Sequence, residues 1–220
     1  MNTSLSFQTS GPASGKKPSQ MVVLLHGLGA NGADLLSLAP YWSSSLPEAI
    51  FVAPDAPDSC DMAPFGYQWF SLQDRSPDAM EKGARRAVPL LNKFLDEQLA
   101  AHSITPDKMA LVGFSQGTMM ALFAAPRRHL PPAAVVGYSG ALIGAAALVD
   151  ETTGKFPVLL VHGDADPVVP FMAMTHAEQN LRTAGFSVTA LSRPGLGHSI
   201  DPEGLSAGAA FLRQSFAAKP

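Results

Sequence analysis

Short apolar runs alternate with longer amphipathic segments along most of this chain. The runs are too short for stable helices and are rich in strand-forming residues. They are Met21–Leu25, Ile50–Ala53, Met109–Val112, Ala133–Tyr138, Phe156–Val161 and Phe186–Leu191. Continuous apolar runs of this kind are typical of strands that are buried on both faces of a largely parallel sheet.

The segments between these runs have the features of helices. The longest follows Ser76-Pro77-Asp78, which supply an N-cap, a first-turn proline and a first-turn acid, and it is expected to extend to about Ala101. Shorter helices are expected over 33–45, 118–125 and 169–184, and a last one ends near residue 215. Alternating strands and helices predict a three-layer α/β fold, with a mostly parallel central sheet and helices on both faces. Ligands of such folds bind at the carboxyl ends of the strands.

Chain length and composition limit the classes of protein that fit. The 220 residues, 46% of them apolar and 15% charged, are expected to form a single domain over residues 1–220. Within it, residues 1–20 should provide an edge strand at Leu5–Gln8 and a turn, and we expect this part to be partly mobile. The net charge of −3 provides no basic surface for nucleic acid.

Cellular context is also suggested by the sequence. Cys60 is the sole cysteine, so an intrachain disulfide and a cysteine metal cluster are both excluded. Residues 1–20 lack the charged start and apolar core of a secretory signal, and no apolar run is long enough to span a membrane. We therefore expect a cytoplasmic protein without stable membrane insertion. The sequence leaves open whether it forms a homodimer.

The segment Gly113-Phe114-Ser115-Gln116-Gly117 is the strongest chemical signal. It follows a predicted strand and precedes a predicted helix. In such a turn the central residue has a strained backbone, and the flanking glycines allow other backbone to approach closely. The arrangement predicts an exposed Ser115 hydroxyl at a helix N-terminus, where the dipole favours negative charge.

A nucleophilic serine needs a base and an acid that orients the base. His198 follows the last predicted strand on a glycine-rich loop, whereas His26 and His162 each precede a turn glycine and suit structural roles. Asp164 and Asp166 both follow an earlier strand. The position of Asp166 before Pro167 favours it as the acid, and Asp164 is more simply explained by bonds to amides of its own turn. The order is nucleophile, acid, histidine.

Two backbone N–H groups are expected to bind the developing oxyanion. One belongs to Gln116, the residue after the nucleophile, and the other to Leu28, in the loop after the first buried strand.

Four segments together resemble the carboxylesterase/acyl-protein thioesterase branch of the α/β-hydrolases. They are His26–Gly32 (HGLGANG), Gly113–Gly117 (GFSQG), His162–Pro170 (HGDADPVVP) and Gly195–His198 (GLGH). The resemblance covers nearly the whole chain from about Val22. It implies a catalytic set of Ser115, Asp166 and His198, an oxyanion hole from Leu28 and Gln116, no cofactor, and hydrolysis of acyl esters or thioesters.

The same resemblance bears on the shape of the substrate site. The family typically lacks a large lid domain, and the segment from Ser139 to Lys155 is too short for one. An open groove is implied, with an apolar wall of Phe65, Trp69, Phe70, Leu142, Ile143 and Val169. In a segment that is similar to one of the family, Ser71 replaces an acidic residue. The resemblance therefore does not imply that this chain prefers lipidated proteins as substrates.

These observations favour a serine carboxylesterase that acts on small acyl esters of short to medium chain length. Acyl-protein thioesterase and lysophospholipase are the alternatives within hydrolases. From another class, Gly27–Gly32 fits the G-x-G-x-x-G pattern of dinucleotide-binding proteins, with Asp55 placed as a ribose-binding acid. That reading leaves Ser115 and His198 unexplained. A non-catalytic binding module is a further alternative, and turnover of p-nitrophenyl acetate would distinguish it.

Overall fold

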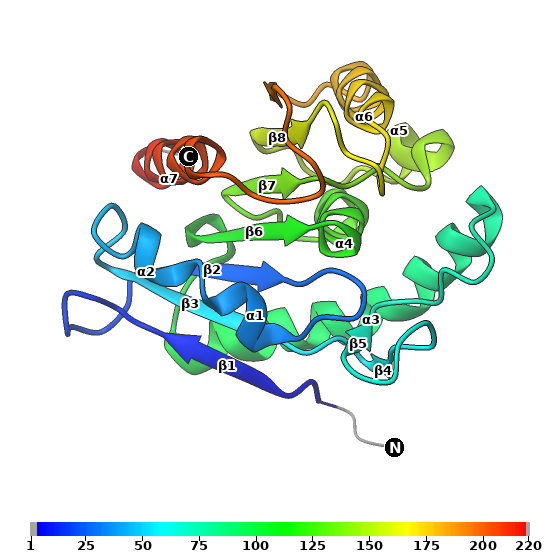
Figure 1. The fold of residues 1–220 in the computed structure, drawn as a ribbon. Helices are drawn as coiled ribbons and strands as arrows, with labels where there is room; N and C mark the ends of the chain where they lie inside the picture. Colours follow the sequence, from blue (N-terminus) through cyan, green and yellow to red (C-terminus); the bar gives the residue numbers. More distant parts are fainter. Residues whose placement is uncertain (1–3, 219–220) are drawn as a thin grey trace.

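Five of the six apolar runs form the interior strands of a seven-stranded sheet, and the last run forms most of an edge strand. The structure, a computed structural model, describes residues 4–218. In spatial order the strands are β1 (Phe7–Ser10), β3 (Ala49–Pro54), β2 (Gln20–Leu25), β6 (Met109–Phe114), β7 (Ala134–Tyr138), β8 (Val158–Gly163) and β9 (Val188–Arg193). Only β1 is antiparallel to its neighbour, so the other strands end at one edge of the sheet (Figure 1).

Helices cover both faces of the sheet, as the alternating pattern predicts. On one face, α3 (Pro77–His102), α4 (Gln116–Ala124), α5 (Leu148–Glu151) and α6 (Met172–Thr183) contribute to a core with Met21, Val23 and Leu25. On the other face, α1 (Gly32–Leu36), α2 (Ala39–Trp42) and α7 (Pro202–Ala217) pack on Val22 and Leu24. Alternate residues of β2 thus point into two different cores, which confirms the predicted three-layer α/β architecture.

Several boundaries differ from those expected. The helix expected over 33–45 is two short helices, α1 and α2, and Pro40 in the first turn of α2 has no N–H to continue the α1 ladder. The edge strand is Phe7–Ser10 rather than 5–8. The helix predicted over 169–184 begins at Met172. The N-cap of α3 is as predicted, since Ser76 Oγ accepts the Ala79 N–H.

The remaining short elements lie in connections. Asp58–Ser59 (β4) and Tyr67–Gln68 (β5) pair as a two-stranded antiparallel ribbon inside the long loop before α3. Turns of 3₁₀ helix occupy Pro106–Lys108, Ala125–Arg127 and Ala145–Ala147. None of the helices within residues 4–218 combines the length and hydrophobicity that a membrane span needs.

The contact between α7 and β7 gives a stability prediction. The buried Tyr138 hydroxyl donates to the Gly204 carbonyl, and a Cβ added at Gly208 would lie 2.1 Å from that hydroxyl oxygen. We expect Gly208→Ala to lower the free energy of unfolding by about 1–3 kcal/mol through overpacking. Urea unfolding measures this, with exposed Ser206→Ala in the same helix as the control. Equal stability of Gly208→Ala and the parent would contradict the packing described here.

Candidate active site

Ser115 lies in a strained turn between β6 and α4. Its backbone has φ +53° and ψ −116°, a conformation that L-residues rarely adopt. The flanking glycines are required by close contacts: a Cβ on Gly113 would lie 2.3 Å from the Thr118 nitrogen, and one on Gly117 would lie 1.8 Å from the Leu25 carbonyl oxygen. The sharp strand-to-helix turn predicted from the sequence is therefore present.

The structure brings His198 and Asp166 to Ser115. His198 Nε2 lies 3.0 Å from Ser115 Oγ, and His198 Nδ1 lies 2.7 Å from Asp166 Oδ2. Because a carboxylate only accepts, Nδ1 carries the proton and Nε2 is left as the acceptor for the serine hydroxyl. The ring of Phe114 packs against the imidazole at a centroid distance of 4.9 Å. Such a chain of bonds lets the imidazole take the hydroxyl proton.

Asp166 is held ionised and fixed in orientation. Its Oδ1 accepts the N–H groups of Val168 and Val169 at 2.8 and 2.9 Å, which leaves Oδ2 for His198. Burial alone would raise the pKa of this carboxyl, but the bonds from His198 and the two amides outweigh it, and the pKa of Asp166 is lowered. The charge that stabilises a protonated His198 is thus present at neutral pH.

Asp164 has a different task from the one expected. Rather than bonding within its own turn, its Oδ1 accepts the Gly195 N–H at 2.6 Å. Gly195 lies in the loop that carries His198. Asp164 therefore ties the loop after β8 to the loop after β9, and so supports the position of the imidazole without contacting it.

His162 and His26 are both buried and bonded to backbone. His162 Nε2 donates to the Val169 carbonyl at 2.9 Å and lies 3.3 Å from Asp166 Oδ2. His26 Nδ1 donates to the Gly27 carbonyl, and its Nε2 accepts the Ala56 N–H. Burial lowers the pKa of His26, which agrees with a neutral ring that accepts a bond. These are the structural roles expected from the sequence.

The loop after β2 runs beside the serine. A Cβ on Gly27 would lie 3.2 Å from the Cβ of Ser115, so the next residue, Leu28, starts close to the nucleophile. Among the hydrogen bonds within residues 4–218, none is donated by the Leu28 N–H. Gln116 is the first residue of α4, where N–H groups have no intrahelical acceptor. Their expected role as donors to an oxyanion stays a prediction.

The Gln116 side chain has a role that sequence reasoning missed. It is fully buried, its Oε1 accepts the Trp69 N–H, and its Nε2 donates to the Phe70 carbonyl. Trp69 Nε1 in turn donates to the His26 carbonyl at 3.0 Å. A buried amide that satisfies two backbone groups fixes the long loop against the turn of Ser115. The only sequence feature that could have indicated this role is the glutamine directly after the serine.

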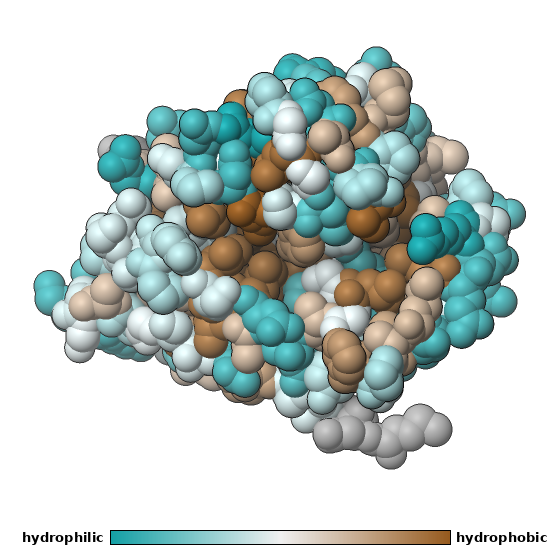
Figure 2. Space-filling model, viewed as in Figure 1, coloured by the Kyte–Doolittle hydropathy of each residue, from teal (hydrophilic) through white to brown (hydrophobic). Residues whose placement is uncertain are grey.

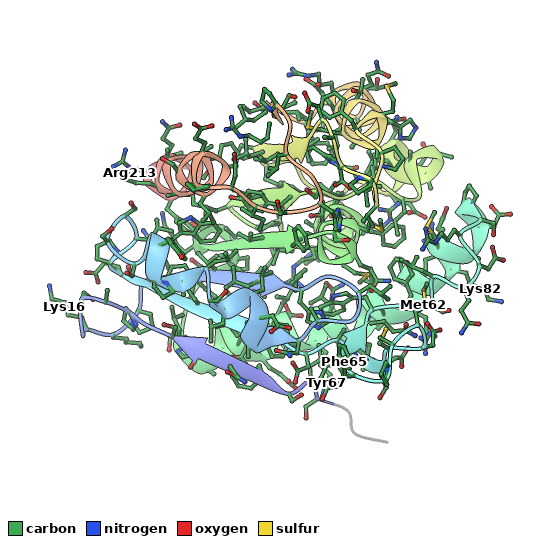
Figure 3. All side chains as sticks on the ribbon, viewed as in Figure 1. Lys16, Met62, Phe65, Tyr67, Lys82 and Arg213 are labelled. Atoms are coloured by element: carbon green, nitrogen blue, oxygen red, sulfur yellow. The ribbon has the colours of Figure 1, made fainter. Side chains whose placement is uncertain are left out.

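The residues of the expected apolar wall are mostly buried. Trp69 and Phe70 have 0% exposure, yet Phe70 lines a cavity of about 470 Å³ beside the first turns of α3, and the place of both residues in the groove stays a prediction. Phe70 is packed against α3, where a Cβ on Gly83 would lie 2.6 Å from the Phe70 Cβ. Phe65 lies at the surface between β4 and β5, 72% exposed (Figure 3). Leu142, Ile143 and Val169 retain 5–8% exposure, and their place in the wall stays a prediction.

A cavity of about 390 Å³ lies beside His198 and Phe114. It is lined by residues from the loop after β2, α1, the end of β6 and the segment before α7: His26, Gly27, Ala30, Asp34, Leu35, Phe114, His198, Ser199 and Ile200. Figure 2 shows apolar surface in a hollow between α1 and the segment that leads to α7. None of the six predicted wall residues lines it. We call it the α1 cavity.

The geometry around Asp55 does not support a dinucleotide site. Its Oδ1 accepts the Gly32 N–H at 2.8 Å and its Oδ2 accepts the Ser6 hydroxyl at 2.7 Å. The carboxylate that would bind a ribose therefore holds the glycine-rich segment itself. A Cβ on Gly32 would lie 2.3 Å from the Ala53 carbonyl, so this glycine is explained by packing on β3.

Comparison with known proteins identifies relatives along almost the whole chain. A family model described as phospholipase/carboxylesterase matches residues 12–216. Acyl-protein thioesterase 1 of Gibberella zeae is 28% identical, over 90% of this chain and 91% of its own. A probable carboxylesterase of Oryza sativa is 31% identical, over 84% of this chain and 73% of its own. The crystal structure of esterase PE8 is 40% identical with a TM-score of 0.91, covering 96% of this chain and 99% of the other.

The two aspartates can be separated by substitution. We expect Asp166→Asn to lower kcat/KM by about 10³–10⁴-fold, because the amide would favour the tautomer of His198 that cannot accept the serine proton. Asp164→Asn keeps an oxygen for the Gly195 N–H and should change kcat/KM little. Ester hydrolysis measures both variants. Equal losses in the two would contradict the assignment of Asp166 as the acid.

The neutral state of His26 predicts a pH dependence of stability. Since burial keeps its folded-state pKa below the ordinary 6.5, the unfolded chain binds a proton at pH values where the folded chain does not. The free energy of unfolding should therefore fall as pH drops below about 6.5. His26→Gln is expected to be less stable at pH 8 but to show a flatter decline from pH 6.5 to 5 in urea unfolding. The exposed His129→Gln serves as control, and an unchanged slope in His26→Gln would refute the explanation.

Proposed function

The chain belongs to the phospholipase/carboxylesterase family of α/β-hydrolases and is a carboxylic ester hydrolase, and from this premise we propose that it is a serine esterase. It would cleave acyl esters of short to medium chain length through Ser115, His198 and Asp166. The observation that carries the proposal is the unbroken pair of hydrogen bonds, 3.0 and 2.7 Å, that joins the three side chains.

The first step is acylation of Ser115. His198 Nε2 takes the hydroxyl proton while Oγ attacks the ester carbonyl carbon, and Asp166 stabilises the imidazolium that forms. The N–H groups of Leu28 and Gln116 would bind the carbonyl oxygen as it becomes negative. This role is supported by the position of both residues beside Ser115, by the absence of an acceptor for the Leu28 N–H within residues 4–218, and by the place of Gln116 in the first turn of α4.

Acylation ends with release of the alcohol, and the second step then releases the acid. When the tetrahedral intermediate collapses, the carbonyl carbon loses its bond to the alcohol oxygen, which receives the proton from His198 Nε2. Water then attacks the acyl carbon while His198 Nε2 takes a proton from it. The bond from that carbon to Ser115 Oγ breaks, the acid leaves, and His198 returns the proton to Oγ. No electron is transferred and no cofactor is required by these steps.

Substrate size is suggested by the space beside Ser115. The α1 cavity, about 390 Å³, is near the lower end of the range of roughly 300–1,000 Å³ for small-molecule sites. That favours small esters. Cleavage of acyl thioesters, as the name of the Gibberella zeae relative suggests, would use the same residues with sulfur as the leaving atom. The family description also includes phospholipases, so lysophospholipids are the third candidate class of substrate.

The assignment is tested by removing the nucleophile. Ser115→Ala should lower kcat for p-nitrophenyl acetate by about 10⁴-fold or more, because no acyl-enzyme can form. The variant must be shown to be folded by its unfolding midpoint. Hydrolysis at nearly the parental rate would refute the mechanism.

A chain-length series of p-nitrophenyl esters, run beside an acyl thioester, tests the substrate class. We expect the highest kcat/KM with short to medium acyl chains. A maximum at long chains, or a preference for the thioester, would instead assign the chain to the lysophospholipase or thioesterase type.

A further inference from the structure

The α1 cavity adjoins one particular side of the nucleophile. Its wall includes His198 and the two residues that follow, Ser199 and Ile200, and the opposite wall is formed by Ala30 and Leu35. The segments that hold Phe65 and Val169 do not line it. The cavity therefore opens beside the imidazole of His198.

The chemistry of the tetrahedral intermediate assigns a substrate group to that side. Besides Ser115 Oγ, the reacting carbon bears an oxyanion, the leaving oxygen and the acyl chain. The oxyanion must point at the N–H groups of Leu28 and Gln116, and the leaving oxygen must lie within hydrogen-bond reach of His198 Nε2, which protonates it. The alcohol group attached to that oxygen then extends along the face of His198.

Building on the proposed esterase function, we propose that the α1 cavity receives the alcohol part of the ester and selects neutral, apolar alcohols. The acyl chain, the third substituent, leaves the reacting carbon in a different direction. The cavity would thus set the preference for the leaving group and not for acyl length.

The lining indicates which alcohols fit. Leu35, Phe114 and Ile200 provide apolar walls, so an aryl or branched alkyl group would gain by leaving water. The charged member is Asp34, whose Oδ2 accepts the Asn31 N–H at the start of α1. No Lys or Arg of residues 4–218 is among the lining residues. An anionic leaving group, such as a phosphate-bearing alcohol, would meet a carboxylate without any compensating cation.

The test compares phenyl acetates whose leaving groups have similar acidity. We expect kcat/KM to be highest for 4-tert-butylphenyl acetate, lower for phenyl acetate and lowest for the anionic 4-(carboxymethyl)phenyl acetate. Ile200→Trp fills the cavity and should lower the ratio of kcat/KM for 4-tert-butylphenyl acetate to that for methyl acetate about tenfold or more. Leu130→Trp, the same change from an aliphatic side chain to tryptophan at an exposed position outside the cavity, should leave the ratio at the parental value.

A second variant tests the charge. Asp34→Asn keeps an oxygen for the Asn31 N–H and removes the negative charge, so it should raise kcat/KM for the anionic ester relative to phenyl acetate. This increase should diminish at high salt. No change in that ratio would contradict the proposed exclusion of anionic alcohols.

The outcomes also separate this inference from the esterase proposal. If Ile200→Trp raises the acetate-to-octanoate ratio of kcat/KM at a fixed alcohol and leaves the alcohol ratio unchanged, the cavity holds the acyl chain and the inference is wrong. If Ser115→Ala retains the parental rate, the esterase mechanism itself fails. A loss confined to bulky alcohols supports both.

Discussion

The left-handed backbone of Ser115 is the constraint on which the site depends. At φ +53° and ψ −116° the serine turns the chain sharply from β6 into α4, and it does so only because Gly113 and Gly117 lack side chains. A strained non-glycine residue persists only where the surrounding structure fixes it. Here the constraint comes from the sheet, because β2 and β6 are paired and the loop after β2 is pressed against the turn.

Two hydrogen-bond networks, one buried and one partly exposed, hold the parts that the turn brings together. On one side, the Gln116 amide, the Trp69 indole and the His26 ring connect the long loop, the start of α4 and the loop after β2. On the other side, Asp164 bonds the loop of His198 to the loop after β8, where His162 donates to Val169. The groups that would react are therefore positioned by side chains that take no part in the proton transfers, as catalytic geometry requires.

The sequence predicted those features that depend on local pattern. Buried strands show as apolar runs, and the glycines around Ser115 show where a strained turn is needed. The order of Ser115, Asp166 and His198 placed them all at strand ends, which lie at one edge of a parallel sheet. The break between α1 and α2 was missed although Pro40 indicated it, because the apolar pattern continues across it.

The features that depend on packing of distant segments could not be predicted. The burial of Trp69 and Phe70 could not be predicted from their place in a long loop, because it depends on bonds to Gln116 and on packing against Gly83. The α1 cavity is built from four separate segments, and no spacing in the sequence relates Leu35 to Ile200. The bond from the Gly195 N–H to Asp164 likewise depends on how the loop after β8 meets the loop after β9.

The most direct measurement of the central claim is the mass of the protein during turnover. Rapid acid quenching of a reaction with a p-nitrophenyl ester, followed by intact-mass and peptide analysis, traps any acyl-enzyme. We expect one acyl group per chain, located on Ser115 and lost with time as acid is released. Turnover without a covalent adduct, or an adduct on another residue, would contradict it.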